Sequence, residues 1–186
     1  MAERPIIFSA PMVRAILAGR KTQTRRVLKP QPPTAPDWHV ADRDEDQVLW
    51  MGDRGTHVQA RIRFAIGDLL WVRESWRTEL RNDDITPRDL RHGVPVYYEA
   101  GGGGEETIPE CAGRLRPSIH MPRWASRITL KVTGVKVERL QDISEEDAEA
   151  EGADPFTGAL QSYRTSFYNI WERIQDRKST RLNSSH

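Results

Sequence analysis

The chain has 186 residues, of which 37% are apolar and 30% are charged, and its formal net charge is +1 at pH 7. This length favours one domain with insertions, and the small net charge means that any nucleic-acid binding must depend on local clusters of charge. The single cysteine excludes an internal disulfide framework and fits a reducing cytoplasm, where we expect the protein. No run of residues predicts a membrane span and no spacing predicts a metal site, so we expect no membrane partner, metal or cofactor.

The first elements are a strand and a short helix. Residues 5–8 (Pro-Ile-Ile-Phe) predict the strand, and a helix follows from Ser9 or Ala10, with Pro11 in its first turn. Gly19 is a natural residue to end this helix, because glycine readily adopts the left-handed conformation found there. One helix face is apolar and comprises Met12, Val13, Ile16 and Leu17.

A basic loop follows the helix. Between Arg4 and Pro36 the chain has no carboxylate but seven cations, which are Arg4, Arg14, Arg20, Lys21, Arg25, Arg26 and Lys29. Such a surface attracts an anion, or a carboxylate from elsewhere in the same chain. Interaction with the helix C-terminus would explain Arg20 and Lys21. It does not explain the rest of the loop, which comprises Thr22, Thr24, Arg25 and Arg26.

Two polar segments are predicted to be insertions. Residues 30–65 contain four early prolines and a charge run, and within them 48–51 should form a hairpin with the segment after Gly55. Residues 77–116 form the second insertion, with a strand over 94–100. Its four glycines at 101–104 lack the lysine and helix of a phosphate-binding loop.

Residues 69–76 predict a strand after a Gly-Asp turn. Alternation places Leu70, Val72 and Glu74 on one face and Trp71, Arg73 and Ser75 on the other. Trp71 and Arg73 share a face, so they could stack on a base or form a cation–π pair with each other. The alternative is that Trp71 is a core residue, and we favour this position.

Residues 117–127 have the composition of a binding loop, with His120, Arg123, Trp124 and Arg127 as candidate ligand contacts. His120 is equally compatible with a structural role. Residues 127–133 and 135–140 alternate in polarity about Gly134, which predicts an antiparallel hairpin.

An acidic helix follows, with Ser144 as its N-cap and Asp147 in the capping-box position. Its first acids complement the helix dipole, but Glu151 lies near the C-terminal end, where an anion is disfavoured. We therefore expect Glu151 to meet the basic loop. A last helix carries an apolar stripe that predicts core packing and comprises Tyr163, Phe167, Ile170, Trp171 and Ile174.

Residues 176–186 have neither an apolar period nor helix-capping residues. In one reading frame they back-translate to a common sequencing-library adapter. We therefore expect them to be a non-native tail, with the natural frame interrupted after about residue 175. An ordinary disordered tail is the alternative.

The order of these elements resembles the ASCH domain, which is related to the PUA RNA-binding fold. The resemblance covers roughly residues 4–29, 64–76 and 117–175, and its most specific part is the Lys-Thr-x-Thr loop after a helix. Residues 8–13 and 118–127 also resemble ASCH-like proteins of phages and prophages. The resemblance implies an α+β fold over 1–175: a small PUA-like β-barrel with flanking short helices and the two insertions, here missing its C-terminal strand.

The resemblance also implies an activity. Some compact ASCH proteins are amidohydrolases that remove the acyl group of N4-acetylcytidine with a lysine, a threonine and a glutamate. Lys21, Thr24 and Glu151 match those positions in this chain. The chemistry is coherent, because a lysine of lowered pKa can activate a threonine hydroxyl and a carboxylate can carry a proton to the leaving amine.

Three hypotheses remain open. The first is an RNA- or nucleotide-binding module that uses the basic loop (Arg20, Lys21, Thr22, Arg25 and Arg26), together with Trp71, Arg73 and the loop at 117–127. The second is the amidohydrolase, and the third is a phage assembly or interaction protein. The sequence does not determine the oligomeric state.

Overall fold

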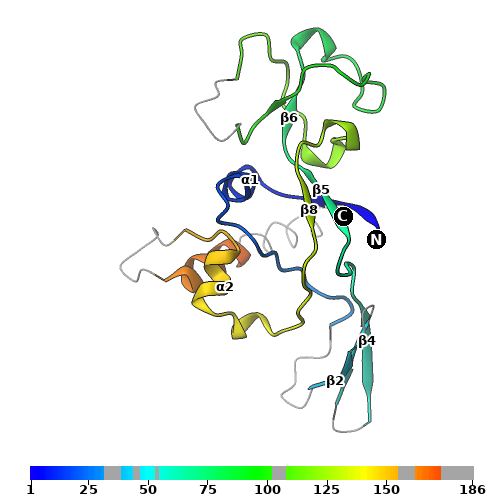
Figure 1. Ribbon diagram of the computed structural model, residues 1–186, viewed down its shortest axis with the longest axis vertical. Helices are drawn as coiled ribbons and strands as arrows, with labels where there is room; N and C mark the ends of the chain where they lie inside the picture. The colour runs from blue at the N-terminus through cyan, green and yellow to red at the C-terminus, as the bar shows by residue number, and fades with distance from the viewer. Residues whose placement is uncertain (32–38, 44–46, 53–54, 102–107, 155–161, 173–186) are drawn as a thin grey trace, which may run out of the picture.

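The computed structural model describes residues 1–31, 39–43, 47–52, 55–101, 108–154 and 162–172. Within these ranges the chain is α+β, with three small sheets and few helices, and none of the sheets closes into a barrel. Figure 1 shows three tiers along the long axis: the second insertion at the top, the central sheet in the middle and the first insertion at the bottom.

The central sheet has the order β1-β5-β8, with β1 (Glu3–Ile7) parallel and β8 (Thr129–Lys131) antiparallel to β5 (Leu69–Arg73). Three consecutive β5 residues are buried: Leu70, Trp71 and Val72. Burial of neighbouring residues, which point to opposite faces, means that this middle strand is covered on both sides. The prediction of a strand here is confirmed, although β5 ends at Arg73.

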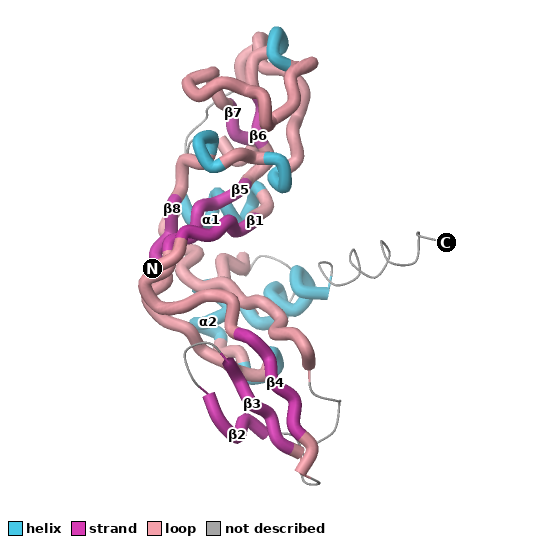
Figure 2. The backbone as a smooth tube through the Cα atoms, turned by 90° about the vertical axis from the view of Figure 1, so that its right-hand side faces the viewer, coloured by secondary structure: helices cyan, strands magenta, loops and turns pink. Residues whose placement is uncertain are grey.

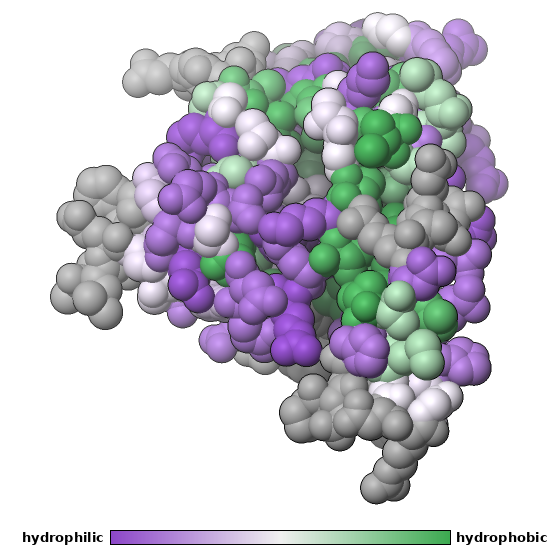
Figure 3. Space-filling view, turned by 60° about the horizontal axis from the view of Figure 1, so that its bottom comes forward, coloured by the Kyte–Doolittle hydropathy of each residue, from purple (hydrophilic) through white to green (hydrophobic). Residues whose placement is uncertain are grey.

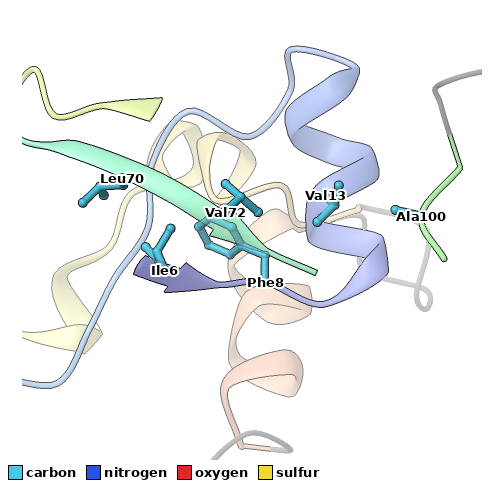
Figure 4. Packing of buried hydrophobic residues seen from close by; sticks show 6 residues of the cluster. All are labelled: Ile6, Phe8, Val13, Leu70, Val72 and Ala100. Carbon is cyan, nitrogen blue, oxygen red and sulfur yellow. The ribbon is translucent and has the colours of Figure 1, made fainter. Parts of the chain in front are cut away.

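Helix α1 (Ala10–Leu17) lies against this sheet and completes its core. In Figure 4 the ring of Phe8 and the side chain of Val13 lie close to the strand residues of the cluster, which comprises Ile6, Phe8, Val13, Leu70, Val72 and Ala100. Gly19 has φ +72° just beyond the helix, as predicted. Leu17 differs from the expected stripe, because its side chain is 40% exposed.

The first insertion forms an antiparallel meander of β2 (His39–Arg43), β3 (Gln47–Met51) and β4 (His57–Arg61) (Figure 2). The predicted β3–β4 hairpin is confirmed, with buried Val48 opposite buried Ala60. Strand β2 was not predicted; it pairs with β3 through a bulge between Val40 and Asp42.

A second small core joins the second insertion to the segments that flank it: Leu90 of the insertion packs with Trp76, Met121 and Ala125. The regular structure in the insertion and its flanks is short: β6 (Trp76–Arg77) pairs with β7 (Tyr97–Tyr98), and three 3-10 turns cover Leu80–Asn82, Ser118–His120 and Arg123–Ala125. The strand expected over 94–100 is therefore only two residues long. The tip at 102–104 lies outside the described residues.

The hairpin predicted over 127–140 is wrong. Only Thr129–Lys131 is a strand, and it pairs with β5, while residues 132–139 form no strand. Glu138 instead contacts the basic loop, and a 3-10 turn at Leu140–Asp142 then leads into α2 (Glu145–Ala150). The side chain of Ser144 accepts a hydrogen bond from Asp147 N at 3.0 Å, so the predicted N-cap is confirmed.

Residues 163–172 are helical and pack on α2 through buried Phe167, which lies in a cluster with Ile143, Ala148 and Ala153. Ile170 differs from the predicted stripe, because it is 38% exposed and does not belong to this cluster. Ile174 and the tail at 176–186 lie outside the described part.

Polar residues cover much of the face in Figure 3, beside a strip of apolar ones.

Candidate functional site

The basic loop joins the C-terminal ends of the two helices. The amides of Arg20 and Lys21 donate to Ala15 O at the end of α1, at 2.9 and 3.0 Å. The next two amides of the loop donate to Ala150 O at the end of α2, at 2.8 and 2.9 Å. The partly negative end of each helix therefore faces the segment that is richest in cations, which is electrostatically favourable.

Lys21 and Glu151 form a buried ion pair at the centre of this junction. Lys21 Nζ donates to Glu151 Oε2 at 2.7 Å, to Glu151 O at 2.8 Å and to Gln23 O at 2.6 Å. The two side chains are only 2% and 7% exposed. All three hydrogens of the ammonium group thus have an acceptor. The structure brings together two predicted site residues that are 130 positions apart in the chain.

Gly152 permits this close approach. Its φ is +80°, and a Cβ built there would lie 3.0 Å from Ala15 Cβ and 3.1 Å from Lys21 Cβ. A larger residue would therefore combine an unfavourable backbone conformation with crowding against both neighbours. The glycine that ends α2 also lets the helix end reach α1 and the lysine.

Arg25 connects three carboxylates of the C-terminal half. It bonds to Glu138, through Nε at 3.0 Å and also through Nη2, to Asp147 at 3.1 Å and to Glu151 at 3.3 Å. Its guanidinium also lies 5.8 Å from the centre of the Phe167 ring. The donors that the sequence offered to a ligand are here directed to partners within the chain.

Thr24 lies half-buried on the same loop, next to the backbone carbonyl that accepts from Lys21. Its hydroxyl oxygen accepts a hydrogen bond from Arg26 Nη1 at 3.1 Å. Arg26 and Lys21 both lie over the Phe8 ring, at 5.7 and 5.6 Å from its centre. The ring of the core residue Phe8 thus forms cation–π contacts with two cations of the site.

Burial sets the protonation chemistry of the pair. Desolvation lowers the pKa of Lys21 below its ordinary value, and the neighbouring carboxylate of Glu151 opposes this shift. A lysine whose charged form is destabilised, in direct contact with a carboxylate, can both accept and return a proton.

Arg20 and Thr22 lie on the outer side of the junction. They line an open hollow of about 270 Å³, together with Gly19, Glu146, Glu149 and Ala150. The structure therefore divides the predicted loop residues between a buried cluster and this exposed hollow.

Trp71 is buried between two guanidinium groups, those of Arg73 at 4.5 Å and Arg123 at 5.9 Å from the ring centre. Arg123 also pairs with Glu3 at 2.6 Å, and Arg73 donates to Ile119 O at 3.2 Å. These contacts agree with the core position that the sequence favoured for Trp71.

The remaining predicted contacts lie in the second insertion or beside it. Arg127 forms two hydrogen bonds with buried Glu74, at 2.9 and 3.0 Å. Trp124 packs edge-on against Trp76 at 6.4 Å. His120 is exposed and lines a second hollow.

Several members of the junction carried little signal in the sequence. Asp147 was assigned only to the helix cap. Glu138 was placed in a hairpin, and no feature of the sequence linked it to the basic loop.

Comparisons of the chain with protein-family models, curated proteins and solved structures found no match. No group of three or more His, Cys, Asp or Glu side chains suited to a metal ion occurs in the described ranges. In the same part of the chain, no helix combines the length and apolar character needed to cross a bilayer.

The buried pair leads to a first prediction. Lys21→Met leaves the Glu151 carboxylate buried with only its contact to Arg25, so the free energy of unfolding should fall by about 3–5 kcal/mol. The double variant Lys21→Met/Glu151→Leu should recover much of this loss, because it buries no unpaired charge. Urea denaturation measures both values and that of the single variant Glu151→Leu, and exposed Lys29→Met is the control that should change nothing. Simple addition of the two single effects would contradict the coupling.

Glu138 leads to a second prediction. Burial alone would raise the pKa of Glu138, but hydrogen bonds from Lys136 and Arg25 outweigh it and hold the pKa below the ordinary value. The resulting stability is complete above the unfolded pKa of about 4.3 and is lost as the pH falls through the lower folded value. Between about pH 5 and pH 2, stability should therefore decline less steeply in Glu138→Gln than in the wild type.

Urea denaturation at several pH values tests this expectation. The exposed residue Glu146 on α2 provides the matched control, since Glu146→Gln makes the same chemical change outside the Arg25 cluster. Equal slopes for the wild type and Glu138→Gln would show that the cluster does not contribute to the acid dependence.

Proposed function

We propose that the protein is an ASCH-type amidohydrolase that removes the acyl group from N4-acylated cytidine-like nucleosides, with Lys21, Thr24 and Glu151 as its catalytic residues. The observation that carries the proposal is the buried 2.7 Å contact between Lys21 and Glu151, beside the loop that bears Thr24. A desolvated lysine in contact with a carboxylate, on a loop that also carries a hydroxyl, provides groups that can activate a weak nucleophile.

The proposed reaction begins with proton transfer from the Lys21 ammonium to Glu151, over the 2.7 Å between Nζ and Oε2. The neutral amine takes the proton of the Thr24 hydroxyl as Oγ1 attacks the acyl carbon. The carbon–nitrogen bond then breaks, and the protonated Glu151 gives its proton to the departing N4 amine. Water hydrolyses the acyl ester on Thr24 and restores the hydroxyl. The hydrogen bond from Arg26 to Oγ1 favours negative charge on that oxygen during attack.

The order of elements also supports the ASCH assignment. A strand, a short helix and the Lys-Thr-x-Thr loop precede the central strand β5, and the acidic helix follows β8. The β1-β5-β8 sheet is the part that would belong to a small PUA-like barrel under this proposal. The two insertions extend from the two ends of this arrangement (Figure 1).

The decisive experiment is incubation of the protein with N4-acetylcytidine, with chromatographic detection of cytidine. The wild type should release cytidine, and Thr24→Val should lower kcat/KM by at least about 100-fold because the nucleophile is lost. Thr133→Val is the matched control: it makes the same change at an exposed position outside the loop and should retain activity. Release no faster than in the buffer blank would overturn the proposal.

A second candidate function is binding of RNA or a nucleotide without catalysis. The exposed position of Arg20 and Arg26 at the surface of the loop favours it, because phosphate contacts require accessible cations. Arg25 contributes less to this candidate, since its guanidinium bonds to three carboxylates.

Under this second candidate, Arg20→Gln/Arg26→Gln should weaken binding to single-stranded RNA. It should also reduce the slope of log K against log salt by about 0.7 for each lost phosphate contact. Fluorescence anisotropy at several salt concentrations measures both effects. Arg61→Gln/Arg88→Gln removes the same charge at exposed positions outside the loop and is the control. Equal losses in the two double variants would exclude a specific role for the loop.

A further inference from the structure

Arg116 is a buried cation at the end of the second insertion. It is 3% exposed, and no carboxylate among the described residues forms an ion pair with it. Its guanidinium donates to Ile85 O at 3.0 Å and to Asn82 O at 2.6 Å, while Nε has no hydrogen-bond partner in the described part of the chain. A buried charge with an unused donor is unfavourable unless another group compensates it.

The carboxylate of Asp83, which acts on Arg116 electrostatically, forms its hydrogen bonds with another group. Both oxygens of Asp83 accept from the backbone amide of Arg114, at 3.0 Å each. Burial and the positive charge of Arg114 lower the pKa of Arg116, and Asp83 only partly opposes them. The local field therefore favours an additional anion.

A hollow of about 240 Å³ is present at this position. Its lining comprises Pro87, Arg114, Leu115, Arg116, Pro117 and His120. Arg114 and His120 are exposed, so they can reach a ligand that enters from solvent. The lining thus combines two arginines and a histidine with apolar residues.

We propose that this hollow binds the phosphate group of a small phosphorylated ligand. A phosphate has several acceptor oxygens and can take hydrogen bonds from more than one guanidinium group, a geometry that arginine suits better than lysine. The Leu115 and proline walls would contact the non-phosphate part of the ligand. The lining residues come from the second insertion and the loop that follows it. The insertion, with β6 and β7, lies on the other side of the central sheet from α2 (Figure 2), so the site does not depend on the proposed amidohydrolase activity.

Titration of the isotope-labelled full chain with inorganic phosphate tests the proposal, using the Nε–H resonance of Arg116 as the reporter. The resonance should shift saturably. Arg114→Gln and His120→Gln should each raise Kd by at least about tenfold, because each removes a charged or polar donor. Both positions are exposed, so these variants preserve the buried reporter. Arg91→Gln, an exposed arginine of the same insertion that does not line the hollow, should change Kd less than about twofold.

Parallel titrations with uridine 5′-monophosphate and uridine identify the source of the phosphate. Tighter binding of the monophosphate than of inorganic phosphate, with no response to uridine, would assign the site to a phosphorylated metabolite or a nucleic-acid end. Binding of inorganic phosphate alone would assign it to the free ion. The absence of a saturable shift at Arg116 with either phosphate probe, or an equal loss in Arg91→Gln, would overturn the proposal.

Discussion

The arrangement of the two halves of the chain depends on one buried ion pair. Moving Lys21 and Glu151 out of water costs several kcal/mol for each ion, and the loss is offset only when the hydrogen-bonding groups around them are satisfied. That condition is met for the lysine, whose three hydrogens bond to one carboxylate and two backbone carbonyls. Such a pair tolerates little displacement. It therefore fixes where the end of α2 lies relative to the loop after α1, and Gly152 makes the required distance possible.

The junction around this pair accounts for part of the positive charge at the start of the chain. Lys21 and Arg25 are matched by three carboxylates, Glu138, Asp147 and Glu151, and the C-terminal ends of both helices face the loop. Two of the seven cations in this stretch are thus compensated by acids more than 110 residues away. The positive field available to a ligand in the loop is correspondingly smaller than the sequence alone indicates.

The features that were predictable from the sequence are mainly those with local causes. Gly19 ends a helix and Ser144 caps one because these effects depend on neighbouring residues, and apolar runs next to turn residues located β5 and the β3–β4 hairpin. The pairing of β8 with β5 is non-local, and alternation alone could not distinguish it from a hairpin with 135–140. Glu151 was correctly expected to meet the basic loop, because an anion at a helix C-terminus requires a compensating cation. Arg116 had no such signal, since its burial depends on the fold of the whole second insertion.

A structural role for Lys21 and Glu151 is compatible with the proposed catalytic role. In water a lysine and a glutamate differ by about six pKa units, so the neutral pair is strongly disfavoured. Burial penalises both charges and therefore brings the neutral pair closer in free energy to the ion pair, while the short contact provides a direct path for the proton. The interaction that holds the loop on α2 is thus also one in which burial reduces the free-energy difference between the ion pair and the neutral pair. Thr24 follows directly after the residue whose carbonyl accepts from Lys21, so the backbone that orders the pair also positions the proposed nucleophile.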